Sequence, residues 1–176
     1  FGVSQGTVKC ASATCGLPRR LSHDSSNAVH RSAPKKGGAP VMPCTLSIDP
    51  ERLTPTPHLG GIAVPVSAIS DRGRRRHAQI TALSASEMIA GIRHARDTGQ
   101  QSFTIVSHSF ELMSRDLERT NRIVDRRFRA LCAAIEAMEG VESADFTHNP
   151  PPVEDAPGTL PPPHYTGLAR RIIGQV

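Results

Sequence analysis

The pattern of apolar and polar residues is clearest in the second half of the chain. The segment "SASE" at residues 84–87 has the form of a helix N-terminus, because Ser84 can accept a hydrogen bond from the backbone of Glu87 and Glu87 can reach back. The apolar spacing that follows predicts a helix that ends at Gly99, a natural C-terminal cap.

A second helix is predicted over most of residues 117–139. Its apolar residues fall at spacings of four, three, four and three, and they form one stripe that consists of Val124, Phe128, Leu131, Ile135 and Met138. The helix is expected to end at Gly140.

Three strands are predicted around these helices. The first is "IAVPVSA" at residues 62–68, and because Pro65 cannot donate a ladder hydrogen bond, this strand is expected to lie at a sheet edge or to break there. Residues 103–107 and 141–146 are the second and third strands. The order strand, helix, strand, helix, strand predicts an α/β fold with a parallel sheet and outer helices.

The two ends of the chain have a different character. Residues 1–60 carry little pattern, and "APKKGGAP" at 33–40 is typical of a loop. The tail, residues 149–176, begins with a proline-rich stretch that cannot form an ordinary helix or a central strand, so an extended linker is expected. We therefore expect a structured α/β region at 61–148 between two flexible ends.

Composition narrows the class of protein. A length of 176 residues suits one domain, and with 38% hydrophobic residues and no Trp the core must be built from Val, Ile, Leu and Ala. The net charge of +5 is compatible with a protein that binds nucleic acid. The arginines, however, gather at 72–76 and 122–129 without interleaved aromatic residues, which is more typical of solvated faces.

The cysteines do not indicate a disulfide framework or a zinc site. Cys10, Cys15, Cys44 and Cys132 form no CxxC motif, and Cys132 falls within the apolar stripe, where a small buried thiol is expected.

A cytoplasmic location is the default expectation, since the first residues lack the features of a signal peptide. No apolar stretch is long enough to span a membrane.

The segment "FTIVSHSFEL" at residues 103–112 carries the candidate chemistry. It places His108 where a predicted strand ends, and in parallel α/β folds ligand-binding and catalytic groups gather beyond the carboxyl ends of strands. An imidazole there can give or take a proton, but it can equally cap the strand by bonding a neighbouring carbonyl. For Glu111 two roles are also open, either orienting His108 or occupying the first turn of a helix.

Several segments together resemble a known family. They are "GIAVPVSAI", "RRRHAQITALSASEM", "FTIVSHSFEL" and "NRIVDRRFRALCAAIEAMEGVE", with a fainter match at "HDSS", residues 23–26. They are similar to the C-terminal half of bacterial polysaccharide deacetylases, the sugar N-deacetylases of the fourth carbohydrate-esterase family. The resemblance implies a partial (β/α) barrel, a polysaccharide or N-acetyl sugar as substrate, and His108 as the general acid. It also implies that Ile105 and Ser107 bind the substrate, with Ile105 lining the acetyl pocket.

The chain departs from the family pattern in its metal ligands. The resemblance implies a divalent metal, zinc or similar, held by an Asp and two His four residues apart, with a second Asp as base. The sequence contains no Asp-Asp pair, and none of its eight His residues are four apart. We therefore expect a truncated deacetylase whose isolated chain is inactive, because the metal and base are what activate the attacking water.

Two other classes of function remain open at this stage. The chain can be a non-catalytic module that binds carbohydrate or a protein partner through an exposed sheet edge. It can also be a basic nucleic-acid-binding protein. This is the weakest of the three hypotheses, because only the arginine runs support it.

Overall fold

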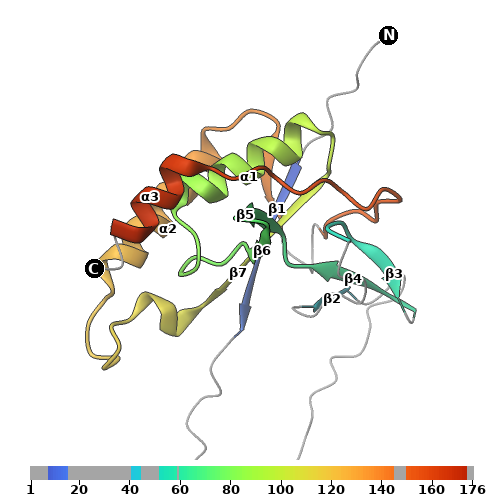
Figure 1. Cartoon of the computed structure of the whole chain (residues 1–176). Coiled ribbons are helices and arrows are strands. Elements are labelled where there is room, and N and C mark those ends of the chain that lie inside the picture. The colour runs from blue at the N-terminus through green and yellow to red at the C-terminus, as the bar shows by residue number, and fades with distance from the viewer. Residues whose placement is uncertain (1–7, 16–40, 45–51, 59, 145–149, 174–176) are drawn as a thin grey trace, which may run out of the picture.

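The computed structural model describes residues 8–15, 41–44, 52–58, 60–144 and 150–173. These residues form a mixed α/β fold with a short 3-10 turn after β7 at Ser109–Leu112. The helices and strands are β1 (Val8–Cys15), β2 (Val41–Cys44), β3 (Thr56–His58), β4 (Gly61–Pro65), β5 (Ala68–Asp71), β6 (Arg74–His77), α1 (Ala85–Asp97), β7 (Ser102–His108), α2 (Arg122–Glu136), β8 (Val141–Ala144) and α3 (Tyr165–Ile173). Figure 1 shows the three helices gathered on one side of the strands.

A three-stranded parallel sheet has the strand order β7-β1-β8. The register of β1 and β7 pairs Lys9 with Ser102 at one end and Cys15 with His108 at the other. The carboxyl ends of these two strands therefore coincide, and Figure 1 shows them side by side. This places the end of β7 beside the end of a parallel neighbour, which is where sites in α/β folds form.

The first predicted strand is divided, and it lies outside this parallel sheet. β4 ends at Pro65 and β5 begins at Ala68, so the predicted break at the proline is confirmed. β4 is the central strand of a separate sheet of order β2-β4-β3, while β5 and β6 form an antiparallel hairpin. The predicted α/β class is confirmed. The expectation that residues 62–68 share one parallel sheet with the other two predicted strands is corrected, and the described residues form no closed barrel.

Local signals define both main helices. Ser84 and Glu87 form the predicted capping box, with the Ser84 amide donating to Glu87 Oε2 at 2.8 Å, and Gly99 has the left-handed φ of +74° expected of a C-terminal cap. α2 begins five residues later than the start of the predicted range, because Asn121 caps it and Leu117 has a φ of +61° that no helix can include.

The core lies between α1, α2 and β7. Its buried side chains include Ile80, Leu83, Met88, Ile92 and Phe103, together with Val124, Leu131 and Met138 from the predicted stripe. Cys132 is exposed, so the prediction of a buried thiol is wrong. It follows Leu131 directly, and one residue turns a helix by about 100°, away from the buried face. The arginines of β6 are exposed, as expected for a solvated face.

The proline-rich tail packs against the fold in residues 150–173, in contrast to the flexible end that was expected. Residues 150–164 contain no helix or strand, as predicted, but Ser102 Oγ and the Gln101 amide both donate to the buried carboxylate of Glu154, at 3.0 and 3.1 Å. The backbone amide of Thr159 donates to the side-chain oxygen of Gln100 at 2.8 Å, and the amide of Glu154 donates to the Pro55 carbonyl at 3.0 Å. Prolines donate no backbone hydrogen bonds, so the donors of this segment are its non-proline residues.

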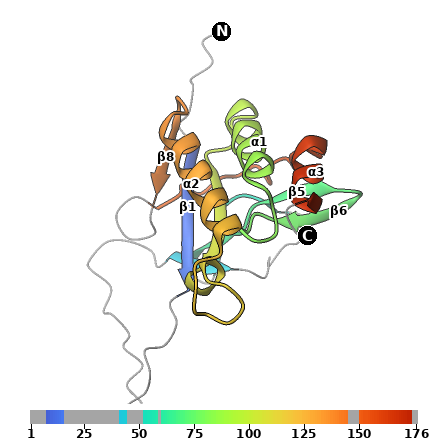
Figure 2. The same ribbon diagram turned by 90° about the vertical axis from the view of Figure 1, so that its left-hand side faces the viewer.

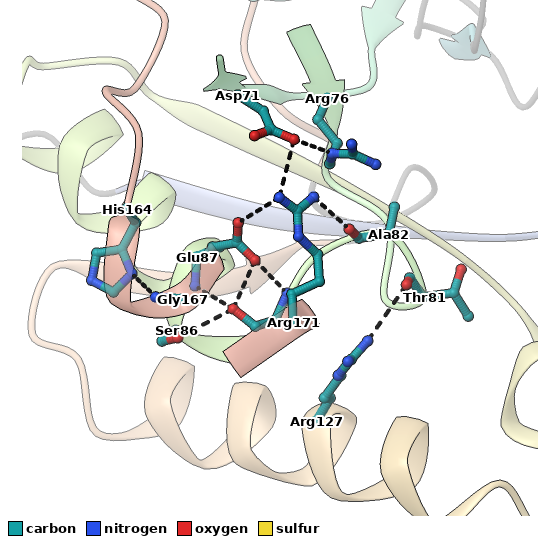
Figure 3. Close-up of polar contacts among 11 residues, drawn as sticks. Asp71, Arg76, Thr81, Ala82, Ser86, Glu87, Arg127, His164, Gly167 and Arg171 are labelled. Carbon is teal, nitrogen blue, oxygen red and sulfur yellow. Dashed lines mark hydrogen bonds and ion pairs between the residues drawn. The ribbon is translucent and has the colours of Figure 1, made fainter. Parts of the chain in front are cut away.

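The last helix, α3, is fixed by buried charges. Arg171 donates to Asp71 Oδ2 at 3.0 Å and to the Ala82 carbonyl at 3.2 Å, and it lies 3.5 Å from Glu87 Oε1 (Figure 3). Figure 2 shows α3 beside α1 and the β5–β6 hairpin. Gly167 allows this close approach, since a Cβ there would lie 2.5 Å from Glu87 Cγ.

In the described part of the chain, no helix combines the length and apolar character that crossing a bilayer requires.

Candidate functional site at the end of strand β7

His108 is the last residue of β7 and lies at the carboxyl end of the strand, as the sequence predicts. Its side chain keeps 29% of its surface exposed. The Nδ1 atom is nevertheless buried and has no hydrogen-bond partner within the described residues. The solvent-accessible part of the ring therefore lies away from Nδ1.

Phe110 lies beside this ring. The two ring centroids are 5.1 Å apart and the ring planes are inclined by 25°, which is a stacked arrangement. Phe110 is itself exposed. The two rings therefore form a polar surface and an apolar surface side by side at the end of β7.

Glu111 is buried beneath the imidazole. The 3-10 turn Ser109–Leu112 brings it back toward His108, because residues three apart share one side of such a turn. Its carboxylate accepts three hydrogen bonds, from Thr81 Oγ1 at 3.0 Å, from the His108 amide at 3.0 Å and from Gln79 Nε2. The carboxylate is therefore fixed in position and in orientation.

The imidazole and the carboxylate face each other. His108 Nδ1 lies 3.5 Å from Glu111 Oε1, and the two form an ion pair whenever the ring is protonated. This distance is longer than a hydrogen bond, but bonds of this kind at catalytic sites are often long in the absence of a ligand. The arrangement can hold an imidazole in one orientation while the rest of the ring meets solvent.

The other two predicted site residues occupy a different environment. Ile105 and Ser107 are both buried, and Ile105 belongs to the hydrophobic core cluster. Side chains alternate along a strand, so both lie on the face of β7 opposite His108. The structure does not bring them to the imidazole, and their contact with a substrate stays a prediction.

The described residues contain no set of ligands for the divalent metal that the resemblance implies. Among residues 8–15, 41–44, 52–58, 60–144 and 150–173, no three His, Cys, Asp or Glu side chains lie close enough to hold an ion. The described residues therefore do not fit a metal centre. The "HDSS" segment at 23–26 lies outside the described residues.

Sequence reasoning missed Gln79 and Thr81. Both lie between β6 and α1, about thirty residues before Glu111, and no spacing rule connects them to it. Gln79 also forms a parallel bridge with Val106, which fixes this segment against β7. The alternation of buried Ala78 and Ile80 with these polar residues was the one local signal of an extended segment here.

Comparison of the chain with protein-family models, curated proteins and solved structures gives no match. The protein has a mixed α/β fold with an imidazole–carboxylate pair at the end of a parallel strand.

Proposed function

We propose that this chain forms part of a sugar N-deacetylase, with a polysaccharide or another N-acetyl sugar as substrate and His108 as the general acid. The observation that carries the proposal is the partly exposed ring at the carboxyl end of β7, backed by the buried carboxylate of Glu111. Motif similarity around residues 103–112 supports the choice of reaction.

The proposed step is proton transfer during amide hydrolysis. Water adds to the acetyl carbonyl and gives up a proton to a base supplied by other groups. The bond between the carbonyl carbon and the sugar nitrogen then breaks, and the nitrogen takes up a proton from the imidazolium of His108. The products are acetate and a free amino sugar. A positioned general acid accelerates such a reaction by about 10²- to 10⁴-fold.

In this function the described residues have two roles, proton donation and contact with the sugar. Phe110 offers an exposed apolar surface next to the ring for that contact. Activation of the water belongs to other groups, since the described residues hold no metal-binding cluster. We therefore expect the purified chain with added zinc, cobalt or manganese to release no acetate from a chitooligosaccharide above the blank.

Sugar binding at His108 can be tested directly on the chain. A chitooligosaccharide is titrated into protein carrying ¹⁵N-labelled histidine, and the ring signals are followed by NMR. The signals of His108 should shift in a saturable manner. Those of His94, a residue of α1 that is hydrogen-bonded to Thr159, should not shift. Equal shifts at both rings, or none at His108, would contradict the proposal.

The acid role is tested in a longer form of the protein that releases acetate. His108→Ala should lower its turnover by about 10²- to 10⁴-fold, while the matched variant His94→Ala leaves turnover unchanged. Both variants should remain folded by circular dichroism, because the exposed part of the His108 side chain supports little packing. Sugar binding with no acetate release in a form that carries metal ligands would favour a non-catalytic carbohydrate-binding role.

A further inference from the structure

The environment of Glu111 is more elaborate than a turn requires. One hydrogen bond from the His108 amide is enough to cap the 3-10 turn. Glu111 accepts two more from Gln79 and Thr81, which belong to a separate segment of the chain. A buried carboxylate is costly unless its oxygens are hydrogen-bonded, so these donors stabilise a charge that the turn itself does not need.

The three donors direct the carboxylate at the imidazole. Oε2 accepts from the His108 amide, while Oε1 accepts from Thr81 and Gln79 and also lies 3.5 Å from His108 Nδ1. All three hydrogen-bond donors are neutral groups. The ion-pair partner that the structure gives this carboxylate is the ring of His108.

The chemistry of the two groups selects one tautomer of the ring. An ionised carboxylate only accepts hydrogen bonds, and a neutral imidazole donates from one nitrogen and accepts at the other. A lone pair on Nδ1 would repel the lone pairs of Oε1, 3.5 Å away, whereas a proton on Nδ1 would be attracted to them. We propose that Glu111 is a positioning residue that keeps a proton on Nδ1 of His108 and leaves Nε2 as the nitrogen that exchanges protons.

This inference rests on the proposed function only for the identity of the proton acceptor, the sugar nitrogen. After the imidazolium gives up the Nε2 proton, the ring is left as the Nδ1–H tautomer that Glu111 favours. The ring then needs no rotation before it takes up another proton at Nε2. The same orientation is maintained through both protonation states.

The test measures the tautomer itself. In ¹⁵N-histidine-labelled protein at about pH 9, the protonated and bare nitrogens of a neutral imidazole have well-separated shifts. We expect His108 to be mainly the Nδ1–H form. Glu111→Gln should lose this form in favour of Nε2–H, because its side-chain amide can donate to Nδ1. His94 in the same spectra serves as the internal control and should not change.

Two outcomes would overturn the inference. One is a wild-type ring in the Nε2–H form, a result that needs no variant and holds even if Glu111→Gln fails to fold. The other is an Nδ1–H ring that persists in a folded Glu111→Gln protein. Thr81→Val, which removes one donor to the carboxylate, is expected to shift the tautomer less than Glu111→Gln does.

The failure of this inference can be told apart from the failure of the proposed function. If the ring is Nδ1–H and a chitooligosaccharide does not perturb it, Glu111 positions an imidazole that does not meet sugar. If the sugar perturbs a ring that is Nε2–H, the sugar site stands and the role of Glu111 is that of a turn cap alone.

Discussion

Replacement of Arg171 by Met is expected to lower the free energy of unfolding by about 3 kcal/mol. The guanidinium of this residue is only 5% exposed and stands between the carboxylates of Asp71 and Glu87 (Figure 3). Its removal leaves the buried carboxylate of Glu87 and the partly buried carboxylate of Asp71 without their shared cation, and the Ala82 carbonyl without a donor. Breaking a buried ion pair by removing one partner costs about 3–5 kcal/mol.

The structure places the expected loss at the lower end of that range. Asp71 keeps a second partner, since Arg76 Nε donates to the same oxygen at 2.7 Å. Glu87 keeps two hydrogen bonds from Ser84, one from the amide and one from the hydroxyl, both at 2.8 Å. Each carboxylate therefore retains part of its compensation when Arg171 is removed.

Arg76→Met is the matched control, because Arg76 and Arg171 contact one and the same carboxylate oxygen. The Arg76 side chain is 45% exposed, and exposed ion pairs contribute about 0–1 kcal/mol. Both variants are compared by urea unfolding followed by circular dichroism. Amide exchange in α3 should accelerate in Arg171→Met alone, since Arg171 connects that helix to β5 and α1.

Arg171→Met would contradict this expectation by losing less than about 1 kcal/mol of stability, or no more than Arg76→Met loses. That result would mean that the charges of this cluster are solvated, as at an ordinary surface. A further check is Asp71→Asn in the Arg171→Met background, which removes a carboxylate that has lost one of its two cationic partners. We expect this second change to recover part of the lost stability.

Three further predictions concern the core and the tail. Leu131→Ala should cost about 2–5 kcal/mol in urea unfolding because Leu131 is buried in the core, whereas the exposed neighbour variant Cys132→Ala should change stability by less than about 0.5 kcal/mol. Gly91→Ala should destabilise by about 1–3 kcal/mol, because its Cβ would lie 2.8 Å from Phe103 Cζ, and a stability gain would show that this contact relaxes freely. Glu154→Gln should change how stability depends on pH, as measured by unfolding curves at several pH values.

The features predicted from sequence are those that local chemistry determines. Ser84 and Glu87 are three residues apart, so a capping box can be recognised without knowing the fold, and the same holds for Gly99. β7 was predicted because residues 103–106 alternate like a strand, and the structure shows that this strand is buried on both faces. The end of that strand, and therefore His108, followed from the same pattern.

The features that were missed depend on residues far apart in the chain. β1, "VKCASATC", alternates too weakly to predict a strand, and its partner β7 is more than ninety residues away. The packing of the tail depends on Glu154 meeting Ser102, which no local rule anticipates. At the site, His108 could be predicted from the sequence and the role of Glu111 was left open, whereas the donors that fix that carboxylate can be identified only in the folded protein.

Glu154 shows how such a long-range contact controls the pH response. Burial raises the pKa of its carboxyl above the ordinary value of 4.5, against the hydrogen bonds from Gln101 and Ser102. A carboxyl whose folded-state pKa is raised binds its proton more tightly in the folded protein than in the unfolded chain. Its contribution to stability is therefore fully present below pH 4.5 and is lost as the pH rises through the folded-state pKa.

The sign of the effect follows from comparison with a side chain that does not titrate. Relative to Glu154→Gln, the wild-type protein should gain stability as the pH falls from neutral toward 4.5, and the difference should level off below that value. Urea unfolding of both proteins at pH values from about 4 to 8 measures this difference, and titrating groups common to both cancel. A difference that stays constant over this range would mean that Glu154 is solvated and that the tail is not held against β7 by this carboxyl. A difference that grows with rising pH would mean that the hydrogen bonds from Gln101 and Ser102 outweigh burial, and it would contradict the expected sign.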